Sequence, residues 1–413
     1  AKNLAEYLNT DTTSATTDIA DGAVTSAKLE NNITIAGNFD VSSGTIKLDG
    51  SYPVGNGNNA LGNNALNSLT NGQYNVGIGL DAGTAITSGI NNIAIGTNTL
   101  KAQSTNIDSI AIGRNALRDN TADNNVAVGS YALQVNTSAA NNTAVGYKSL
   151  FTNTTGTLNT AVGKGALQSS TTASDNTAVG GGAMEDNTTG ANNAAFGRTA
   201  LAENTTGSGN TAIGRDALKI ANASNNTAVG YSALLLNTTG TQNVAIGKDA
   251  LEANTTADNN VAVGLNAMAA NTTGADNTSV GTSALASNST ASNNTALGRR
   301  TLNLNTTGAN NTAVGGDALK VNSTASNNTA VGKSALSENT TGGQNTAIGN
   351  RCMNNNTTGS DNTIIGRDAG YSFTSCTRNV GIGYSAGSQI TTGSKNSILG
   401  SYNGNQSGLD IRT

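Results

Sequence analysis

The chain has 413 residues, 51 of them glycine and only 3% aromatic, so it offers few large side chains for a thick globular core. Its net charge is −4 and it has no basic cluster, which argues against binding nucleic acid through the phosphates. Histidine is absent, which excludes the common Ser-His and Cys-His nucleophiles and most zinc sites. We therefore expect no catalytic residue, cofactor or metal ion.

The first part of the chain, residues 1–51, differs from the remainder. The sequence predicts one helical turn at 4–8, a Thr- and Ser-rich linker, and two strands at 33–41 and 45–48. The only proline, Pro53, stands at the junction with the next part. We interpret residues 1–51 as an attachment or adaptor region. No run of 18 apolar residues occurs anywhere, so no membrane insertion is expected.

Residues 52–400 are filled by a repeat whose clearest copy is Asn-Thr-Ala-Val-Gly at 159–163. There are 21 copies, and the last residue of each, here called the closing glycine, recurs from Gly62 to Gly400. Eighteen of the 20 intervals are 17 residues and two are 16. Such a period is typical of a solenoid, and β-branched residues two apart indicate strands. The pattern predicts an all-β parallel β-solenoid, a β-roll or β-helix of about 21 rungs and roughly 100 Å at the strand spacing.

Two apolar columns recur in the repeat. The residue before the closing glycine is Val, Ile, Leu or Phe in all 21 copies, and the fourth residue after it is Leu or Met in 17. We predict that these columns face each other across the core, on two strands of each rung. The predicted core residues are Val162, Val179, Val229, Val263, Val314 and Val331 in one column and Leu150, Leu167, Leu234 and Leu319 in the other.

Asparagine stands four residues before the closing glycine in 20 of 21 copies, the exception being Ser109. A short amide repeated at one corner can bond its copies above and below, so a structural ladder is expected. Its predicted members include Asn142, Asn159, Asn176, Asn243 and Asn311. Both 16-residue intervals are shortened near the Asn-Thr-Thr-Gly segment, at 120–123 and 221–224, which we interpret as the exposed outer corner.

A third column, two residues before the closing glycine, is always small or Ile and never charged. Its side chains point opposite to the Val column, so we expect them at contacts between identical chains in a parallel homotrimer. The candidates for this trimer face are Ala144, Ala161 and Ala178. Cys352 and Cys376 fall in different columns, so a disulfide between them is not expected, and Cys352 is interpreted as a small buried residue.

The Asn-Thr-Ala-Val-Gly-x-x-Ala-Leu-x-x-Asn-Thr-Thr-Gly repeat resembles the shaft repeats of bacteriophage tail-fibre and other virion appendage proteins. Residues 19–29, Ile-Ala-Asp-Gly-Ala-Val-Thr-Ser-Ala-Lys-Leu, are similar to a segment near the start of such fibres. The ending, 399–413, resembles the segment that leads into a self-cleaving C-terminal chaperone domain in that family. More loosely, the repeat is similar to the Ser-Val-Ala-Ile-Gly repeats of trimeric autotransporter adhesin heads, which form left-handed parallel β-rolls.

The resemblance implies a left-handed solenoid and a homotrimeric shaft for host attachment, located on the virion after assembly in the host cytoplasm. Residues 1–51 would bind the baseplate, the tail or an adjoining fibre protein, 401–413 would be the exit segment, and a host surface receptor would be a further partner. A cell-surface or extracellular-filament adhesin is an alternative. An ice- or surface-binding solenoid is another, but it would need two threonine columns side by side on one flat face.

Overall fold

The computed structural model describes residues 56–404. The chain divides after Asp49, so every described residue belongs to the second unit, Gly50–Thr413. The interpretations of residues 1–51 and of Pro53 lie outside the described residues, as does the exit segment beyond residue 404. Within 56–404 the secondary structure consists of short strands joined by turns, with no helix.

The strands number 21, one for each copy of the repeat, and each has three residues and ends immediately before a closing glycine. Their bounds are β1 Asn59–Leu61, β2 Val76–Ile78, β3 Ile93–Ile95, β4 Ile110–Ile112, β5 Val126–Val128, β6 Thr143–Val145, β7 Thr160–Val162, β8 Thr177–Val179, β9 Ala194–Phe196, β10 Thr211–Ile213, β11 Thr227–Val229, β12 Val244–Ile246, β13 Val261–Val263, β14 Thr278–Val280, β15 Thr295–Leu297, β16 Thr312–Val314, β17 Thr329–Val331, β18 Thr346–Ile348, β19 Thr363–Ile365, β20 Val380–Ile382 and β21 Ser397–Leu399.

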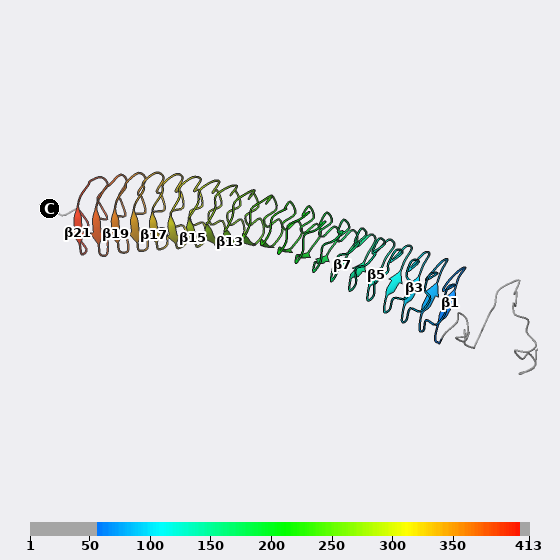
Figure 1. The fold of residues 1–413 in the computed structure, drawn as a ribbon. Helices are drawn as coiled ribbons and strands as arrows, with labels where there is room; N and C mark the ends of the chain where they lie inside the picture. The colour runs from blue at the N-terminus through cyan, green and yellow to red at the C-terminus, as the bar shows by residue number, and fades with distance from the viewer. Residues whose placement is uncertain (1–55, 405–413) are drawn as a thin grey trace, which may run out of the picture. The chain divides into compact units, whose positions relative to one another are not determined.

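Each strand pairs in parallel with the next along the chain, without any shift in register. Thr160, Ala161 and Val162 of β7, for example, lie beside Thr177, Ala178 and Val179 of β8. The 21 strands therefore form one continuous sheet on one side of a coil (Figure 1). The predicted all-β parallel β-solenoid with a 17-residue spacing is confirmed.

The remainder of each rung is made of tight turns rather than a second strand. Ala166 N–H donates to the Gly163 carbonyl at 3.3 Å, and Ser170 N–H donates to the Leu167 carbonyl at 3.2 Å. Leu167 itself has φ +51°, a left-handed conformation that costs about 1–2 kcal/mol in a residue with a Cβ. Burial of its side chain offsets this cost with about 1.5–3 kcal/mol. The Leu column is thus in the core as predicted, but the strand expected to carry it is absent.

The two outer residues of each strand point away from the core, and the middle residue points into it. Ala161 is fully buried, whereas Thr160 and Val162 are partly exposed. Burial of Leu150, Leu167, Leu234 and Leu319 is confirmed. Two predictions are wrong. The valines predicted to lie in the core point outward and are only half-buried: Val162, Val179, Val229, Val263, Val314 and Val331. The alanines predicted to lie at contacts between chains are buried within their own chain: Ala144, Ala161 and Ala178.

The reason for this reversal is the narrow interior of the rung. The Leu column already fills the space opposite the middle residue of the strand: a Cβ added at Gly77 would lie 2.7 Å from Leu66 Cγ. Where the strand carries the larger Ile364, the Leu column holds Gly370, whose added Cβ would lie 3.4 Å from Ile364 Cγ2. The middle position is therefore small because a tightly packed core limits it, and not because another chain approaches it.

The closing glycines stack directly on one another at the C-terminal ends of the strands. Gly264 has φ +136°, which residues with a Cβ rarely adopt, and a Cβ added there would lie 2.7 Å from the carbonyl carbon and oxygen of Gly281. The same conflict with the next rung's backbone is found at Gly146, Gly230 and Gly315. Both the conformation and the stacking thus require glycine at this corner.

The asparagine column before each strand forms the expected ladder. Asn159 N–H donates to Asn142 Oδ1 at 3.0 Å, and Asn159 Nδ2 donates to the Ala173 carbonyl at 2.8 Å. The backbone-to-amide bond recurs at Asn176, Asn243 and Asn311, each buried, so the predicted ladder is confirmed. These bonds satisfy the polar groups that a solenoid corner would otherwise leave buried without partners.

A second asparagine ladder was missed by the sequence-based interpretation. The Asn of Asn-Thr-Thr-Gly, seven residues after the closing glycine, is also buried: Asn254 Nδ2 donates to Asn237 Oδ1 at 2.7 Å and to the Ala257 carbonyl at 3.1 Å. The two residues between this Asn and the buried Gly or Ala are half-exposed or exposed. The two 16-residue rungs have one such residue instead of two, since Ala122 and Ala223 there occupy the buried Gly/Ala place. The corner is therefore outer only at these intervening residues.

The exception in the first ladder, Ser109, is compensated by a longer amide in the same rung. Gln103 stands where the second ladder has Asn, and its Nε2 donates to Asn92 Oδ1 at 2.7 Å. Asn92 Oδ1 also accepts from Ser109 N–H at 3.1 Å. Gln103 therefore supplies the side-chain donor that an asparagine at position 109 would have contributed, so the two ladders act together at this rung.

The second ladder is interrupted at Ser170, and the polar atoms there lack partners. Asn153 Oδ1 and Ser170 Oγ are both buried without a hydrogen bond. In Ser170→Asn, the new Nδ2 should donate to Asn153 Oδ1, and the new Oδ1 should accept from Asn187 Nδ2. We expect these two bonds to raise the free energy of unfolding by about 1–2 kcal/mol. Chemical denaturation of the variant measures this gain. Ser169→Asn, one residue away and half-exposed, is the control, and a loss of stability in Ser170→Asn would contradict the ladder argument.

Candidate functional site

Residues 56–404 hold no group of three or more Cys, Asp or Glu placed to bind a metal ion. A shallow groove near the C-terminal rungs is lined by Arg351, Asp368 and Tyr371 together with serines and a glutamine. Arg351 Nε donates to Asp368 Oδ1 at 2.7 Å, and this bond raises the pKa of the guanidinium. The groove's charges thus neutralise each other and leave no free base beside a nucleophile.

The two cysteines are equally unsuited to nucleophilic chemistry. Both are buried and free, and Cys352 is a small core residue as predicted. Burial raises the pKa of Cys352 to about 12 and that of Cys376 to about 11, so both remain neutral thiols at physiological pH. Within residues 56–404, no helix is long and apolar enough to span a lipid bilayer.

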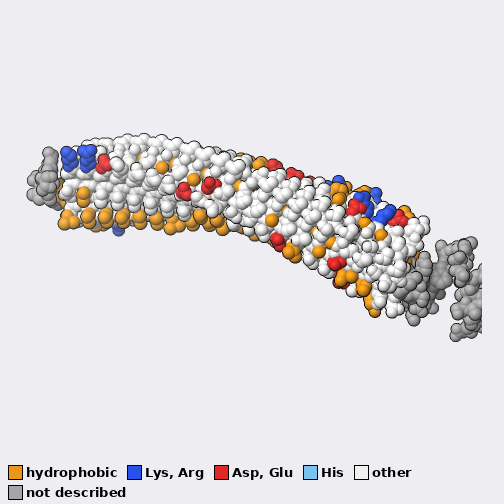
Figure 2. All heavy atoms as spheres, in the orientation of Figure 1, with side chains coloured by type: hydrophobic (Ala, Val, Ile, Leu, Met, Phe, Trp, Pro, Cys, Tyr) orange, Lys and Arg blue, Asp and Glu red, His pale blue; other side chains and the backbone are white. Residues whose placement is uncertain are grey.

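The distinctive surface of the rod is the outward side of the 21-stranded sheet, here called the strand face. It consists of the first and third residues of every strand. The third residue is Val, Ile, Leu or Phe in every rung, and the first is Thr in 11 of 21. Phe196 is 42% exposed, Ile246 40% and Leu297 47%. Figure 2 shows this column as an unbroken hydrophobic row along one edge of the C-terminal half.

The strand face, counting its apolar column and its threonine-rich column together, is large for the surface of a single chain. At about 4.8 Å per strand and about 7–10 Å across three residues, 21 strands give roughly 700–1,000 Å². The apolar column is about half of this area, comparable with the largest apolar patch of a typical monomer, about 300–600 Å². A standard interface takes about 800 Å² from each partner. The face therefore has the area of a complete protein interface.

One side of the strand face is bordered by the basic rim, the first residue after each closing glycine. Eight of its 21 positions are Lys or Arg, three are Tyr and none is acidic. Arg215, Lys248 and Arg367 pair with the aspartate that follows each of them. Lys164, Arg198 and Lys333 form no ion pair within the described part of the chain. The rim consequently keeps a positive charge.

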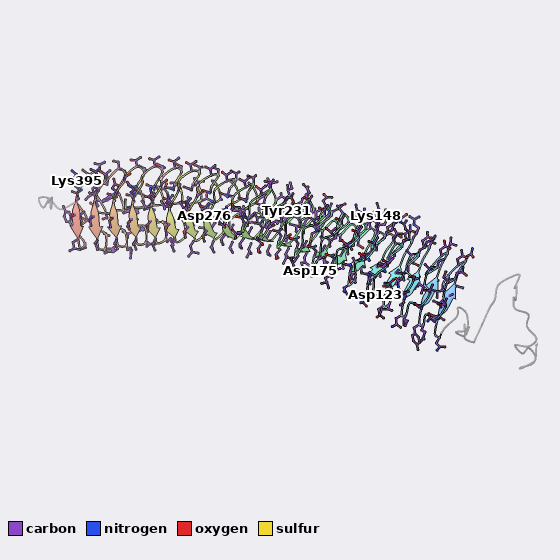
Figure 3. All side chains as sticks on the ribbon, in the orientation of Figure 1. Asp123, Lys148, Asp175, Tyr231, Asp276 and Lys395 are labelled. Carbon is purple, nitrogen blue, oxygen red and sulfur yellow. The ribbon has the colours of Figure 1, made fainter. Side chains whose placement is uncertain are left out.

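The other side is bordered by the acidic rim, the fifth and sixth residues before each closing glycine. Its aspartates are Asp108, Asp123, Asp175, Asp258, Asp276 and Asp361. Its only cations, Arg378 and Lys395, are confined to the last two rungs. In Figure 3, Asp123 and Asp175 lie along the lower edge of the N-terminal half, and Asp276 lies higher, on the C-terminal half. Because the acidic rim precedes each strand and the basic rim follows it, the strand face separates the two rims.

Aromatic side chains add a local cluster beside the basic rim. Tyr131 packs edge-on against Tyr147, with ring centroids 6.0 Å apart, and against Phe151 at 6.4 Å. The Arg114 guanidinium lies 4.7 Å from the Tyr131 ring centroid. Because single aromatic substitutions at variable surface positions carry no periodic signal, the sequence pattern did not indicate this cluster.

No protein-family model and no curated protein matches this chain. The functional interpretation therefore depends on the rod, its strand face and the resemblance of its repeats.

Proposed function

We propose that this chain is a structural shaft of a bacteriophage fibre, built from identical copies in a homotrimer, that holds a host-recognition surface away from the particle. The observation that carries this proposal is the outward column of the strand face, which is apolar in all 21 rungs and forms a continuous hydrophobic row along the C-terminal half in Figure 2. Water exposure of such a surface is unfavourable by about 25 cal/mol for each Å² that association would bury. Association of rods along this face would remove that cost.

The repeat architecture supports a mechanical rather than a chemical role. Each rung contacts only its neighbours, so length is set by the number of repeats, as a spacer requires. The chemistry of such a shaft is that of stacking and adhesion, without turnover of a substrate. The resemblance to virion appendage proteins supplies the viral setting, in which residues 1–51 would attach to the particle and the far end would approach a host receptor.

The alternatives make different demands on the same surface. An ice-binding face would need two threonine columns, whereas the strand face has one, and the column beside it is apolar in every rung. A cell-surface adhesin would need an anchor encoded with the chain. The strand face itself does not distinguish an adhesin from a phage fibre, but the location of the protein does.

Two measurements test the proposal. Native mass spectrometry of the purified chain should give a trimer, and immunogold labelling with antibodies to the rod should mark appendages of phage particles. A stable monomer would contradict the trimeric shaft. Label on the host envelope instead of on particles would indicate the adhesin. Sequencing beyond the codon for Thr413 would further test the setting, since a chaperone-protease domain is expected there.

A further inference from the structure

The strand face and its two rims have the features of a surface that recognises a second copy of itself. The apolar column occupies the centre, the basic rim lies beyond one corner of the rung and the acidic rim beyond the other. Both rims continue from rung to rung along the stack because the register between strands never shifts. Each copy therefore presents complementary charges on the two sides of one apolar stripe.

Symmetry decides which arrangements bring opposite charges together. If copies are related by a rotation axis along the rod, the basic rim of one copy lies beside the acidic rim of the next. If two copies face each other in antiparallel directions, the two-fold axis runs across the rods and sets each rim against its own kind. Like charges in register are unfavourable, so the rims favour parallel copies and oppose antiparallel ones.

We propose that the two rims select the partner and direction of self-association, pairing the basic rim of one chain with the acidic rim of a parallel, unshifted neighbour. This rests on the proposed assembly of identical chains and adds the contacts that orient it. Cyclic symmetry forbids any shift along the axis, so rungs must match by number. Asp108 and Asp361 then share their rungs with Arg114 and Arg367 of the neighbour.

The remaining aspartates of the acidic rim also find cations close by in the unshifted arrangement. Asp175 of one copy lies one rung from both Lys164 and Arg198 of its neighbour, and Asp258 lies one rung from the neighbour's Lys248. One rung corresponds to about 4.8 Å, well within the Debye length of about 8–10 Å. In the last rungs, where Arg378 and Lys395 replace acids, the basic rim has Tyr384 and Ser401 instead of cations.

Charge reversal tests the pairing. The acidic-rim variant carries Asp175→Lys and Asp258→Lys, and the basic-rim variant carries Lys164→Asp, Arg198→Asp and Lys248→Asp. We expect each variant to raise the concentration for half-assembly by about tenfold or more at low salt, and the combination of all five substitutions to restore assembly. Sedimentation velocity measures the assembly, and thermal unfolding checks that each chain stays folded.

The outcomes separate this pairing from the assembly on which it rests. If the unmodified chain remains monomeric, the proposed homotrimer fails. If the chain assembles but neither single-rim variant weakens assembly, or the combined variant does not recover it, the rim pairing is overturned and the assembly stands. A spin label attached at Lys395→Cys tests the relative direction of the rods. A short distance between the labels of two copies supports parallel rods, and the absence of a short distance in the assembled protein overturns the parallel arrangement.

Discussion

Replacing Gly264 by alanine should lower the free energy of unfolding by about 3–5 kcal/mol, the largest loss expected from adding a single methyl group. The backbone there has φ +136°, and the new Cβ would lie 2.7 Å from the Gly281 carbonyl carbon and oxygen. Strain at such a φ costs about 1–3 kcal/mol, and overpacking against rigid neighbours adds a similar amount. Thermal and denaturant unfolding of the variant measure the loss.

The matched control is Gly181→Ala, one residue beyond a closing glycine. An added Cβ there meets nothing within 4 Å, and its φ lies outside the left-handed region. This substitution should change stability by less than about 0.5 kcal/mol. If Gly264→Ala were as stable as Gly181→Ala, the direct stacking of closing glycines would be refuted.

Ala161→Lys should destabilise the chain itself by about 4 kcal/mol or more. Ala161 is completely buried beside the Leu column, so the ammonium group would have to lose its proton or leave the core. Burial lowers the pKa of a lysine by up to about 3–5 units, and each unit corresponds to about 1.4 kcal/mol. Limited proteolysis should show new cleavage near β7.

A pH series gives this prediction a specific signature. Between the lowered pKa of the introduced, buried lysine and the ordinary lysine value, the unfolded chain binds more protons than the folded one. The destabilisation should therefore diminish as the pH rises toward about 10. Val162→Lys is the control, because its side chain points outward: the rung should stay folded while self-association weakens. Equal unfolding in both variants would contradict the assigned directions of the strand residues.

The sequence was sufficient for the period, the parallel stacking and the first asparagine ladder, because each repeats a strong local preference 20 times or more. It was insufficient for the direction of the strand. Alternation shows that Ala161 and Val162 lie on opposite sides, but it does not show which side is inside. The usual rule that larger apolar residues are buried failed because Leu167 and two asparagine columns already fill the small interior.

The second ladder shows a different limit. Asn in Asn-Thr-Thr-Gly is a common turn residue, so its repetition was explained by turn preference without reference to burial. The signal that could have revealed it is paired variation: Gly83, Gly370 and Gly387 replace Leu where Ile86, Phe373 and Ile390 replace Asn three residues later. Side chains that exchange volume in this way share one interior space: a Cβ added at Gly370 would lie 3.4 Å from Phe373 Cδ2.

The interruptions of the second ladder have a mechanical consequence. Between Ser170 and Ala221 the second ladder has a single hydrogen bond between side chains, from Asn204 to Asn187. From Asn237 to Asn356, by contrast, eight successive asparagine side chains are hydrogen-bonded to one another. A rod pulled from its ends should therefore not give way evenly. Rungs near 170–221 should unfold at lower force than the rungs between Asn237 and Asn356, which should unfold together in one step. Optical-trap traces with equal steps along the whole rod would show instead that the ladder bears no load.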